Sequence, residues 1–320
     1  CILLATSRGG PLRAPASTFV FIGVTTGQSS IMRVFPRWME VLGRPEVAIE
    51  GLDLPPHAAP DRYRQAVARI ERDPTTRGAL VTTHKIDLLE AAADLFDRLG
   101  RYAKLCGEVS CIAKHEGALC GYALDPIAGG RSLDAVLGPG YFARSGGHVL
   151  CFGAGGAATA IAVHLIEKQS RADRPARFLV VNRSPGRLER LRELVRRTGT
   201  DIAFEYVLSE DPHDNDARMA HLPPGSVVIN ATGMGKDRPG SPVTGEGTFP
   251  LDGVAWELNY RGALDFLHQA EAQASARRLV VEDGWRYFLH GWSEAIARVL
   301  DLQIDEAIFQ QLGAVAAEVR

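Results

Sequence analysis

A glycine-rich segment in the second half of the chain has the residue types and spacing of a phosphate-binding loop. It follows an apolar run typical of a strand and opens a segment typical of a helix. In such a unit the first glycine permits a tight turn, the second lets the backbone approach a pyrophosphate, and a small residue allows close helix packing. The N–H groups at the helix N-terminus then face the phosphates. We predict a dinucleotide site here rather than a turn that only links strand to helix. Its residues are Gly153, Ala154, Gly155, Gly156 and Ala157.

The end of the next predicted strand indicates which dinucleotide is bound. An NAD enzyme normally places an acid there to bind the ribose hydroxyls. This chain has Asn182, Arg183 and Ser184 instead, and Arg187 follows one turn later. Guanidinium groups can bind a 2′-phosphate, and two arginines at a helix N-terminus need an anion to offset the helix dipole. We therefore predict NADP as the cofactor, with a solvated helix turn as the alternative.

Two charged residues in the first half, Lys85 and Asp125, each follow a predicted strand. Lys85 comes after the strand over 78–82, and Asp125 follows a hairpin of 109–113 and 118–124. Ligands usually bind at the carboxyl ends of strands in such sheets. The pair can therefore move a proton to or from a substrate oxygen while a cofactor carries hydride. Taken alone, a surface salt bridge is the commoner meaning of a lysine and an aspartate.

Strand-like runs alternate with helix-period segments along the whole chain, a pattern typical of parallel sheets covered by helices. A glycine-rich stretch over 138–147 marks the crossing into a second unit, where the pattern restarts. Two final helices have no strand after them, so we expect them to pack on the first domain or to bridge the two. The predicted strands are 19–24, 47–52, 78–82, 148–152, 178–182, 202–208, 226–230 and 254–258, and the predicted helices include 31–42, 61–72, 86–98, 156–169, 284–300 and 303–318.

The predicted fold class is α/β with two domains and a cleft between them. A chain of 320 residues is more comfortable as two domains than as one. We predict an N-terminal α/β substrate-binding and catalytic domain over 19–130, joined by the C-terminal helices 284–320. A C-terminal Rossmann NADP-binding domain is predicted over 131–283. We interpret residues 1–18 as a trimmed extension that carries no fold information.

Composition argues against several classes of partner. The 36 basic and 38 acidic residues nearly cancel, so no overall field favours nucleic acid or an anionic membrane. The longest apolar stretches, such as 19–24 and 226–231, are too short to span a bilayer, and no basic-then-apolar leader precedes them. The five cysteines lack a Cys-x-x-Cys pair, so we expect reduced thiols and no metal. We expect a cytoplasmic enzyme, monomer or homodimer, that binds a small molecule.

These residues resemble the shikimate and quinate dehydrogenase family from about residue 19 to about residue 300. In the first half, 81–85 resembles the family's Val-Thr-x-Pro-x-Lys block, 107–110 its Gly-Ala-Val-Asn, and 123–126 its Asn-Thr-Asp-Gly. In the second half the glycine loop and the Asn182 segment resemble the family's NADP site, 230–232 its Asn-Ala-Thr strand end, and 257–260 its Asp-x-x-Tyr.

The resemblance implies a role for each matching residue. Lys85 becomes the acid/base, and Asp125 hydrogen-bonds the reacting hydroxyl and orients Lys85. The implied substrate-binding residues are Ser29, Ser30, Thr82, Ser110, Tyr260 and His290. The implied cofactor residues also include Asn230, Ala231 and Thr232 beside the nicotinamide ribose, together with Gly284.

Several departures from the family lie at the hydroxyl-binding positions. Leu80 stands where an asparagine is usual, and Ser110 and Ala123 replace two more. Ile31 falls at the second serine of a Ser-x-Ser unless Ser30 serves instead. The glutamine position falls on His290 or Gly291, the proline before the lysine is missing, and one residue is deleted there. Trp285, Arg286 and Tyr287 replace small or aliphatic residues, either contacting a bulkier ligand or packing the interdomain seam.

The combination predicts an NADP-dependent dehydrogenase or reductase with a changed substrate. We expect that substrate to be a small cyclic polyol or ketone resembling shikimate. Two alternatives stay open, namely a true shikimate dehydrogenase and a catalytically silent NADP-binding regulator.

Overall fold

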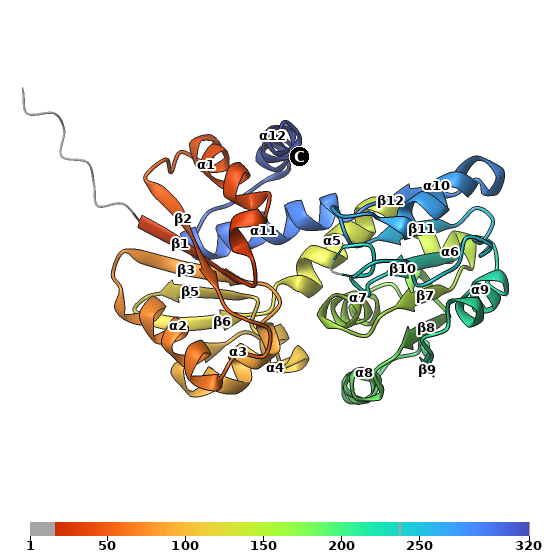
Figure 1. The fold of residues 1–320 in the computed structure, drawn as a ribbon, viewed down its shortest axis with the longest axis horizontal. Helices are drawn as coiled ribbons and strands as arrows, with labels where there is room; N and C mark the ends of the chain where they lie inside the picture. The colour runs from red at the N-terminus through yellow and green to blue at the C-terminus, as the bar shows by residue number, and fades with distance from the viewer. Residues whose placement is uncertain (1–16, 237, 320) are drawn as a thin grey trace, which may run out of the picture. The chain divides into compact units, whose positions relative to one another are not determined.

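The computed structural model describes residues 17–236 and 238–319, and it divides into two compact units (Figure 1). The first unit contains residues up to 100, 108–122 and those from 295 onward, and the second contains 101–107 and 123–294. The chain thus enters the second unit before the glycine-rich stretch 138–147. Residues 1–16 of the interpreted extension lie outside the described part. Ser17 and Thr18, which we had assigned to that extension, belong instead to strand β1.

The first unit is built on a six-stranded mixed sheet. Its order is β2-β1-β3-β5-β6-β4, in which β1, β2 and β3 are parallel and β5 runs antiparallel to both β3 and β6. The strands are β1 (Ser17–Gly23), β2 (Val47–Asp53), β3 (Thr76–Val81), β4 (Arg98–Leu99), β5 (Cys111–His115) and β6 (Ala118–Tyr122); the helices are α1 (Ile31–Val41), α2 (Pro60–Arg72), α3 (Lys85–Ala92) and α12 (Glu306–Ala317).

Helix α1 forms because its apolar residues recur at helical spacing and all face the core. Ile31, Val34, Phe35, Trp38 and Met39 are completely buried, which is the i, i+3, i+4, i+7, i+8 pattern of an amphipathic helix. Trp38 also donates its indole N–H to the carbonyl of a residue in α12, at 2.8 Å. This bond ties the C-terminal helix to the first unit.

The predicted hairpin is confirmed, but β5 begins two residues later than expected and β6 ends two residues earlier. Glu116 and Gly117 both have positive φ, 52° and 79°, as a two-residue type I′ turn requires. The predicted helix over 86–98 is wrong in its second half. Helix α3 ends at Ala92, a single 3₁₀ turn follows, and Arg98 pairs with Cys120 of β6. Tertiary strand pairing therefore overrides the local helical pattern.

The second unit is a fully parallel, doubly wound sheet of order β12-β11-β10-β7-β8-β9. This is the Rossmann arrangement, in which strand order reverses between β7 and β10 and ligands bind outside the carboxyl ends of those strands. The predicted α/β fold class is therefore confirmed. The strands are β7 (Val149–Phe152), β8 (Arg177–Asn182), β9 (Ala203–Leu208), β10 (Val227–Asn230), β11 (Val254–Glu257) and β12 (Val280–Glu282); the helices are α4 (Arg101–Cys106), α5 (Asp125–Leu137), α6 (Tyr141–Ser145), α7 (Gly156–Glu167), α8 (Pro185–Thr198), α9 (Pro212–Ala220), α10 (Asp265–Arg277) and α11 (Trp285–Leu300), which continues into the first unit.

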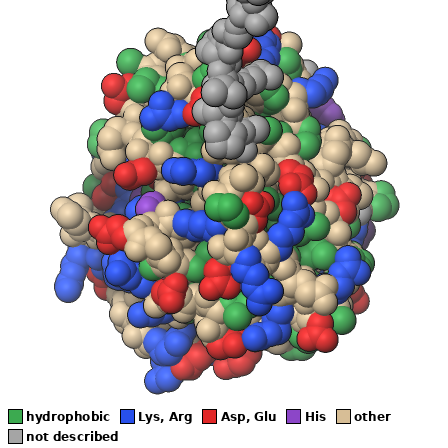
Figure 2. All heavy atoms as spheres, turned by 90° about the vertical axis from the view of Figure 1, so that its left-hand side faces the viewer, with side chains coloured by type: hydrophobic (Ala, Val, Ile, Leu, Met, Phe, Trp, Pro, Cys, Tyr) green, Lys and Arg blue, Asp and Glu red, His purple; other side chains and the backbone are tan. Residues whose placement is uncertain are grey.

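Surface and composition features agree with an ordinary globular chain. On the face drawn in Figure 2, basic and acidic side chains are interspersed rather than gathered by sign. Within the described residues, no helix combines the length and apolarity that crossing a membrane would need. Burial raises the pKa of the Cys111 and Cys151 thiols to about 12, which makes them unreactive.

Candidate active site

The glycine loop between β7 and α7 has the backbone that a bound pyrophosphate requires. Gly153 has φ +108°, and a Cβ added there would lie 2.5 Å from the carbonyl oxygen of Ala231. Only glycine fits this position. A Cβ on Gly155 would meet no atom within 4 Å, so the space before the α7 N-terminus is open. Ala158 is completely buried, which lets α7 pack closely on the sheet.

Backbone hydrogen bonds bring three predicted cofactor segments to one edge of the second sheet. The amide of Gly153 donates to the carbonyl of Val181 at 2.8 Å, and the amide of Ala231 donates to that of Phe152 at 2.7 Å. The glycine loop therefore lies between the ends of β8 and β10. Asn182 closes the β8 end through a bond from its side-chain amide to the Ser184 carbonyl, at 3.2 Å.

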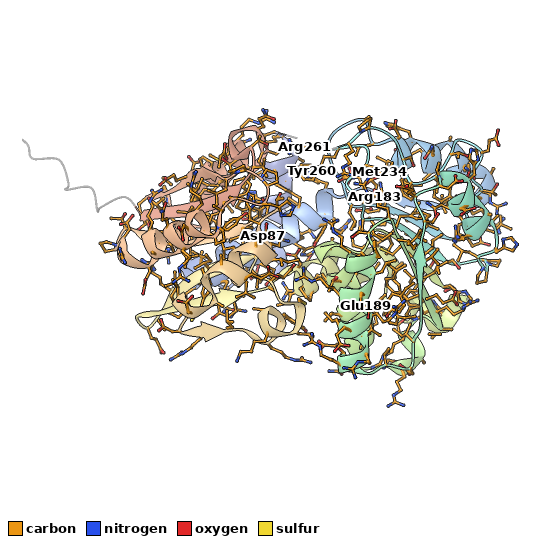
Figure 3. The ribbon with its side chains drawn as sticks, turned by 60° about the horizontal axis from the view of Figure 1, so that its bottom comes forward. Asp87, Arg183, Glu189, Met234, Tyr260 and Arg261 are labelled. Carbon is orange, nitrogen blue, oxygen red and sulfur yellow. The ribbon has the colours of Figure 1, made fainter. Side chains whose placement is uncertain are left out.

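The start of α8 presents two arginines to solvent. Arg183 and Arg187 are exposed, the first turn of α8 holds no acid, and neither arginine pairs with an acid in the part of the chain that the structure describes. Farther along α8 the arginines are neutralised, as in the pair of Arg192 with Glu189 at 2.5 Å. Figure 3 labels Arg183 at the start of the helix and Glu189 farther along it. Unpaired guanidinium groups beside a helix N-terminus suit a 2′-phosphate.

A completely buried carboxylate, that of Glu257, joins the ends of β10 and β11. Its Oε2 accepts from the Asn230 side chain at 2.6 Å, and its Oε1 accepts from the backbone and side-chain N–H groups of Asn259 at 2.8 and 2.7 Å. Asn259 also donates to the Met234 carbonyl at 3.0 Å, while the Asn230 oxygen accepts from the Thr232 hydroxyl at 2.6 Å. The network holds the predicted nicotinamide-side segment in place. Burial raises the pKa of Glu257 to about 7, and the three donors oppose that shift.

Tyr260, the predicted substrate-contacting tyrosine, packs on the first turn of α11. Its ring centroid lies 5.6 Å from that of Trp285 and 4.8 Å from that of Phe288. Figure 3 labels Tyr260 together with Met234 at this end of the unit. A Cβ on Gly284 would lie 2.1 Å from the Leu258 carbonyl oxygen, so this glycine allows α11 to start against the end of β11.

The predicted substrate residues of the first unit cluster at the carboxyl ends of β1 and β3. The amide of Thr82 donates to the carbonyl of Ile22 at 3.0 Å, and the carbonyl of Lys85 accepts from the amide of Val109 at 3.0 Å. The carbonyl of Ser110 accepts a hydrogen bond from the amide of Val81 in β3 at 2.8 Å. Two more predicted residues, Ser29 and Ser30, connect the 3₁₀ turn after β1 to α1.

Asp125 is the first residue of α5 and belongs to the second unit, whereas Lys85 is the first residue of α3 in the first unit. Their function as a pair stays a prediction. The Asp125 Oδ2 accepts a hydrogen bond from the Tyr287 hydroxyl at 3.2 Å. His290 lies farther along α11.

Sequence reasoning missed the polar residues whose importance depends on burial. His84, beside Lys85, is 1% exposed; its Nδ1 lies 3.2 Å from the Tyr63 hydroxyl, and its Nε2 has no hydrogen-bond partner among the described atoms. Thr26 is likewise buried and donates from its hydroxyl to Asp53 at 2.6 Å, which fixes the loop before Ser29. Both lie just beyond a strand end, which is the signal that could have found them.

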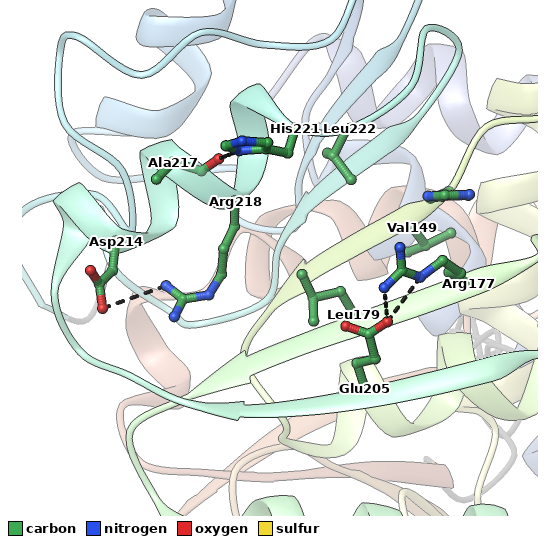
Figure 4. A pocket seen from close by; sticks show the side chains of 10 residues that line it. Val149, Arg177, Leu179, Glu205, Asp214, Ala217, Arg218, His221 and Leu222 are labelled. Carbon is green, nitrogen blue, oxygen red and sulfur yellow. Dashed lines mark hydrogen bonds and ion pairs between the residues drawn. The ribbon is translucent and has the colours of Figure 1, made fainter.

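A separate cavity of about 350 Å³ lies at the opposite edge of the second sheet (Figure 4). It is lined at the starts of β7 and β8 by Val149 and Arg177 and on α9 by Arg218 and His221. Because the glycine loop follows the ends of these strands, the cavity is distinct from the cofactor edge. No cluster of three or more His, Cys, Asp or Glu residues in the described chain could hold a metal.

The chain is similar in sequence and in fold to proteins of known function. A shikimate dehydrogenase (NADP(+)) from Methylobacterium radiotolerans is 30% identical over 272 residues, which cover 84% of this chain and 86% of the relative. The crystal structure of shikimate 5-dehydrogenase from Thermus thermophilus in complex with NADP(H) and shikimate has a TM-score of 0.68 and 25% identity, covering 94% of this chain and 99% of that one. A ligand-free 5-ketofructose reductase from Gluconobacter shares the fold at a TM-score of 0.65 and 21% identity, covering 96% of this chain and 100% of that one. No protein-family model matches the chain.

Fold and site together define a two-unit protein with a Rossmann sheet whose switch point carries a phosphate-binding loop. The chain belongs to the shikimate dehydrogenase family, as the resemblance predicts.

The unpaired arginines of α8 generate a prediction on cofactor choice. NADPH should bind much more tightly than NADH. Arg183→Ala should lower the ratio of the NADH dissociation constant to that of NADPH at least tenfold. A lost charge-assisted contact to the 2′-phosphate costs about 1.5 to 3 kcal/mol. Dissociation constants from fluorescence titration test this. Arg196→Ala, which removes an arginine paired with Glu193 on the same helix, is the control and should leave the ratio unchanged. Equal constants for the two cofactors in the unmodified protein would refute the prediction.

The buried Glu257 generates a prediction on pH dependence. Its pKa rises from 4.5 to about 7 on folding, so the folded state binds a proton in that window. The contribution of Glu257 to the stability of the second unit should be most favourable below about pH 4.5 and should become about 3 kcal/mol less favourable as the pH rises to about 7. Hydrogen exchange of the backbone amides of β10 and β11 measures the free energy of opening at each pH. Glu257→Gln should flatten this slope, while the exposed Glu210→Gln should keep it. A pH-independent opening energy in the unmodified protein would contradict the assignment.

Proposed function

We propose that this protein interconverts a ring hydroxyl and a ketone on a small shikimate-like cyclic polyhydroxy compound. As a member of the family, the chain is an NADP-dependent oxidoreductase acting on CH–OH groups. NADP is therefore confirmed as the cofactor. The identity of the ring is the part that we propose.

We assign the cofactor-binding and proton-transfer roles to the predicted site residues as follows. The glycine loop, the α8 arginines and the segment 230–232 would hold the NADP, which when bound supplies the hydride acceptor and donor. Lys85 would take the hydroxyl proton during oxidation and return it during reduction. Asp125 would accept a hydrogen bond from the reacting hydroxyl and orient the ammonium group of Lys85. Ser29, Thr82 and Tyr260 would position the ring.

The observation that carries the choice of a modified ring is the loss of polar side chains at hydroxyl-binding positions. Leu80 is 8% exposed and Ala123 is 3% exposed, and neither side chain can form a hydrogen bond. Ser110 is nearly buried, and its Oγ lies 3.5 Å from the Tyr122 carbonyl oxygen, within its own strand pair. A ring hydroxyl facing an apolar wall loses its water without gaining a partner, at a cost of about 1 to 3 kcal/mol.

A true shikimate dehydrogenase is the second candidate, favoured by the names of the relatives. The two candidates differ in substrate alone, so turnover of shikimate separates them. A silent NADP-binding regulator would bind the cofactor without oxidising any ring. The presence of both Lys85 and Asp125 argues against that reading, because no packing need requires both.

Lys85 generates a prediction on the chemical step. Lys85→Met should lower kcat by about 10²- to 10⁴-fold, the usual contribution of general acid/base catalysis, with NADPH affinity nearly unchanged. Steady-state kinetics and cofactor titration measure the two effects. Lys104→Met, at an exposed position of α4, serves as the control. A Lys85→Met protein with most of its turnover would show that this lysine has a structural role.

The lost polar partners generate a prediction on the substrate. Two ring hydroxyls that each lose a hydrogen-bond partner, at about 1 to 3 kcal/mol per hydroxyl, lower kcat/KM for shikimate by roughly 30- to 10⁴-fold. NADP reduction should be measured with shikimate beside quinate, aminoshikimate-like rings and other cyclitols. Another ring should be preferred. A kcat/KM for shikimate of about 10⁵ M⁻¹s⁻¹ or above, ordinary for an enzyme on its own substrate, would favour the true shikimate dehydrogenase.

A further inference from the structure

Tyr287 lies in the first turn of α11, at a position where the family it resembles has small or aliphatic residues. Its ring contacts the side chain of Trp256 at the end of β11 edge-on, with centroids 6.3 Å apart. It also lies along α5, because a Cβ added to Gly129 would sit 3.5 Å from a carbon of the Tyr287 ring. The aromatic ring is thus held between two elements of the same unit.

The position of Gly129 shows which face of α5 the tyrosine lies against. Gly129 follows Asp125 by four residues, so the two lie one above the other on one face of the helix. A Cβ at 129 would make ordinary van der Waals contact with the ring, so Tyr287 lies beside the face of α5 that begins at Asp125. Its hydroxyl then donates to the Oδ2 of Asp125 at 3.2 Å.

A phenol that donates to a carboxylate restricts the carboxylate in two ways. It selects one rotamer of the aspartate, and it occupies a lone pair of one particular oxygen, Oδ2. Under the proposed function, the reacting hydroxyl must then donate to one of the remaining lone pairs. Small or aliphatic residues at position 287 have no donor with which to do this.

We propose that Tyr287 is a positioning residue that orients the Asp125 carboxylate for its hydrogen bond to the reacting hydroxyl. The inference rests on the proposed function, because it takes Asp125 as a member of the catalytic pair. Tyr287 acts through Asp125 and is assigned no contact with the substrate.

The test is a double-mutant cycle on turnover. The variants are Tyr287→Phe, Asp125→Asn and the double variant, each assayed for NADP reduction with the fastest ring among shikimate, quinate, aminoshikimate-like rings and other cyclitols. Tyr287→Phe removes the hydroxyl and keeps the ring that packs on Trp256 and Gly129. We expect kcat to fall about ten- to a hundredfold, as for the loss of a hydrogen bond to a charged group, with NADPH affinity and melting temperature nearly unchanged. In the Asp125→Asn background the same change should alter kcat less than about twofold.

Tyr102→Phe is the matched control. It removes another phenol-to-carboxylate hydrogen bond of the second unit, from Tyr102 to the Oε2 of Glu167 at 2.7 Å. It should leave kcat unchanged. A purely structural role for Tyr287 would lower the melting temperature and add independently to Asp125→Asn.

The outcomes separate the inference from the proposed function. If Asp125→Asn is impaired while Tyr287→Phe keeps full kcat, or if the two effects are additive, the positioning role is overturned and the proposed function stands. If the unmodified protein turns over no ring, the proposed function fails and the inference fails with it. If Asp125→Asn keeps full turnover, the role assigned to Asp125 and the inference both fail, while the ring activity stands. Strong coupling between the two variants supports the assignment.

Discussion

The buried carboxylate of Glu257 is the interaction on which the cofactor edge of the second sheet depends. It has no contact with solvent, so its charge is compensated only by the three N–H donors of Asn230 and Asn259. Those donors belong to the two strand ends on one side of the switch point. Removing the carboxylate would leave the two side-chain amides, among the described residues, only the Met234 carbonyl as an acceptor and would release the segment that ends in Thr232. A buried network of this kind is stabilising only when all of its members are satisfied.

The conformation of the glycine loop is constrained by the space available to Gly153. Gly153 must approach the carbonyl of Ala231 so closely that no side chain fits, and the resulting turn leaves the α7 N-terminus open. The same edge therefore offers backbone N–H groups, two unpaired arginines and an ordered strand end within one Rossmann unit.

Most of the predicted substrate residues belong to the first unit rather than to the Rossmann unit. Thr82, Ser110 and the predicted catalytic Lys85 lie near the carboxyl end of β3, where backbone hydrogen bonds hold them. Leu80 in the first unit and Ala123 in the second are apolar and buried. Neither side chain can form a hydrogen bond, which is the reason for our proposal of a modified ring. In the second unit, Tyr287 adds a donor to Asp125.

Local sequence determined those features of this protein that depend on neighbours along the chain. Periodicity predicted ten of the twelve described strands and gave bounds for six of the twelve described α-helices. The glycine spacing indicated the cofactor loop, and the arginines after β8 indicated NADP. Only the tertiary structure decided what depends on residues brought together by folding. It converted the end of a predicted helix into β4, added the three-residue β12, and buried Glu257 beside two asparagines. The bond between Tyr287 and Asp125 joins residues 162 positions apart, a separation at which no periodicity carries information, because only packing sets the distance.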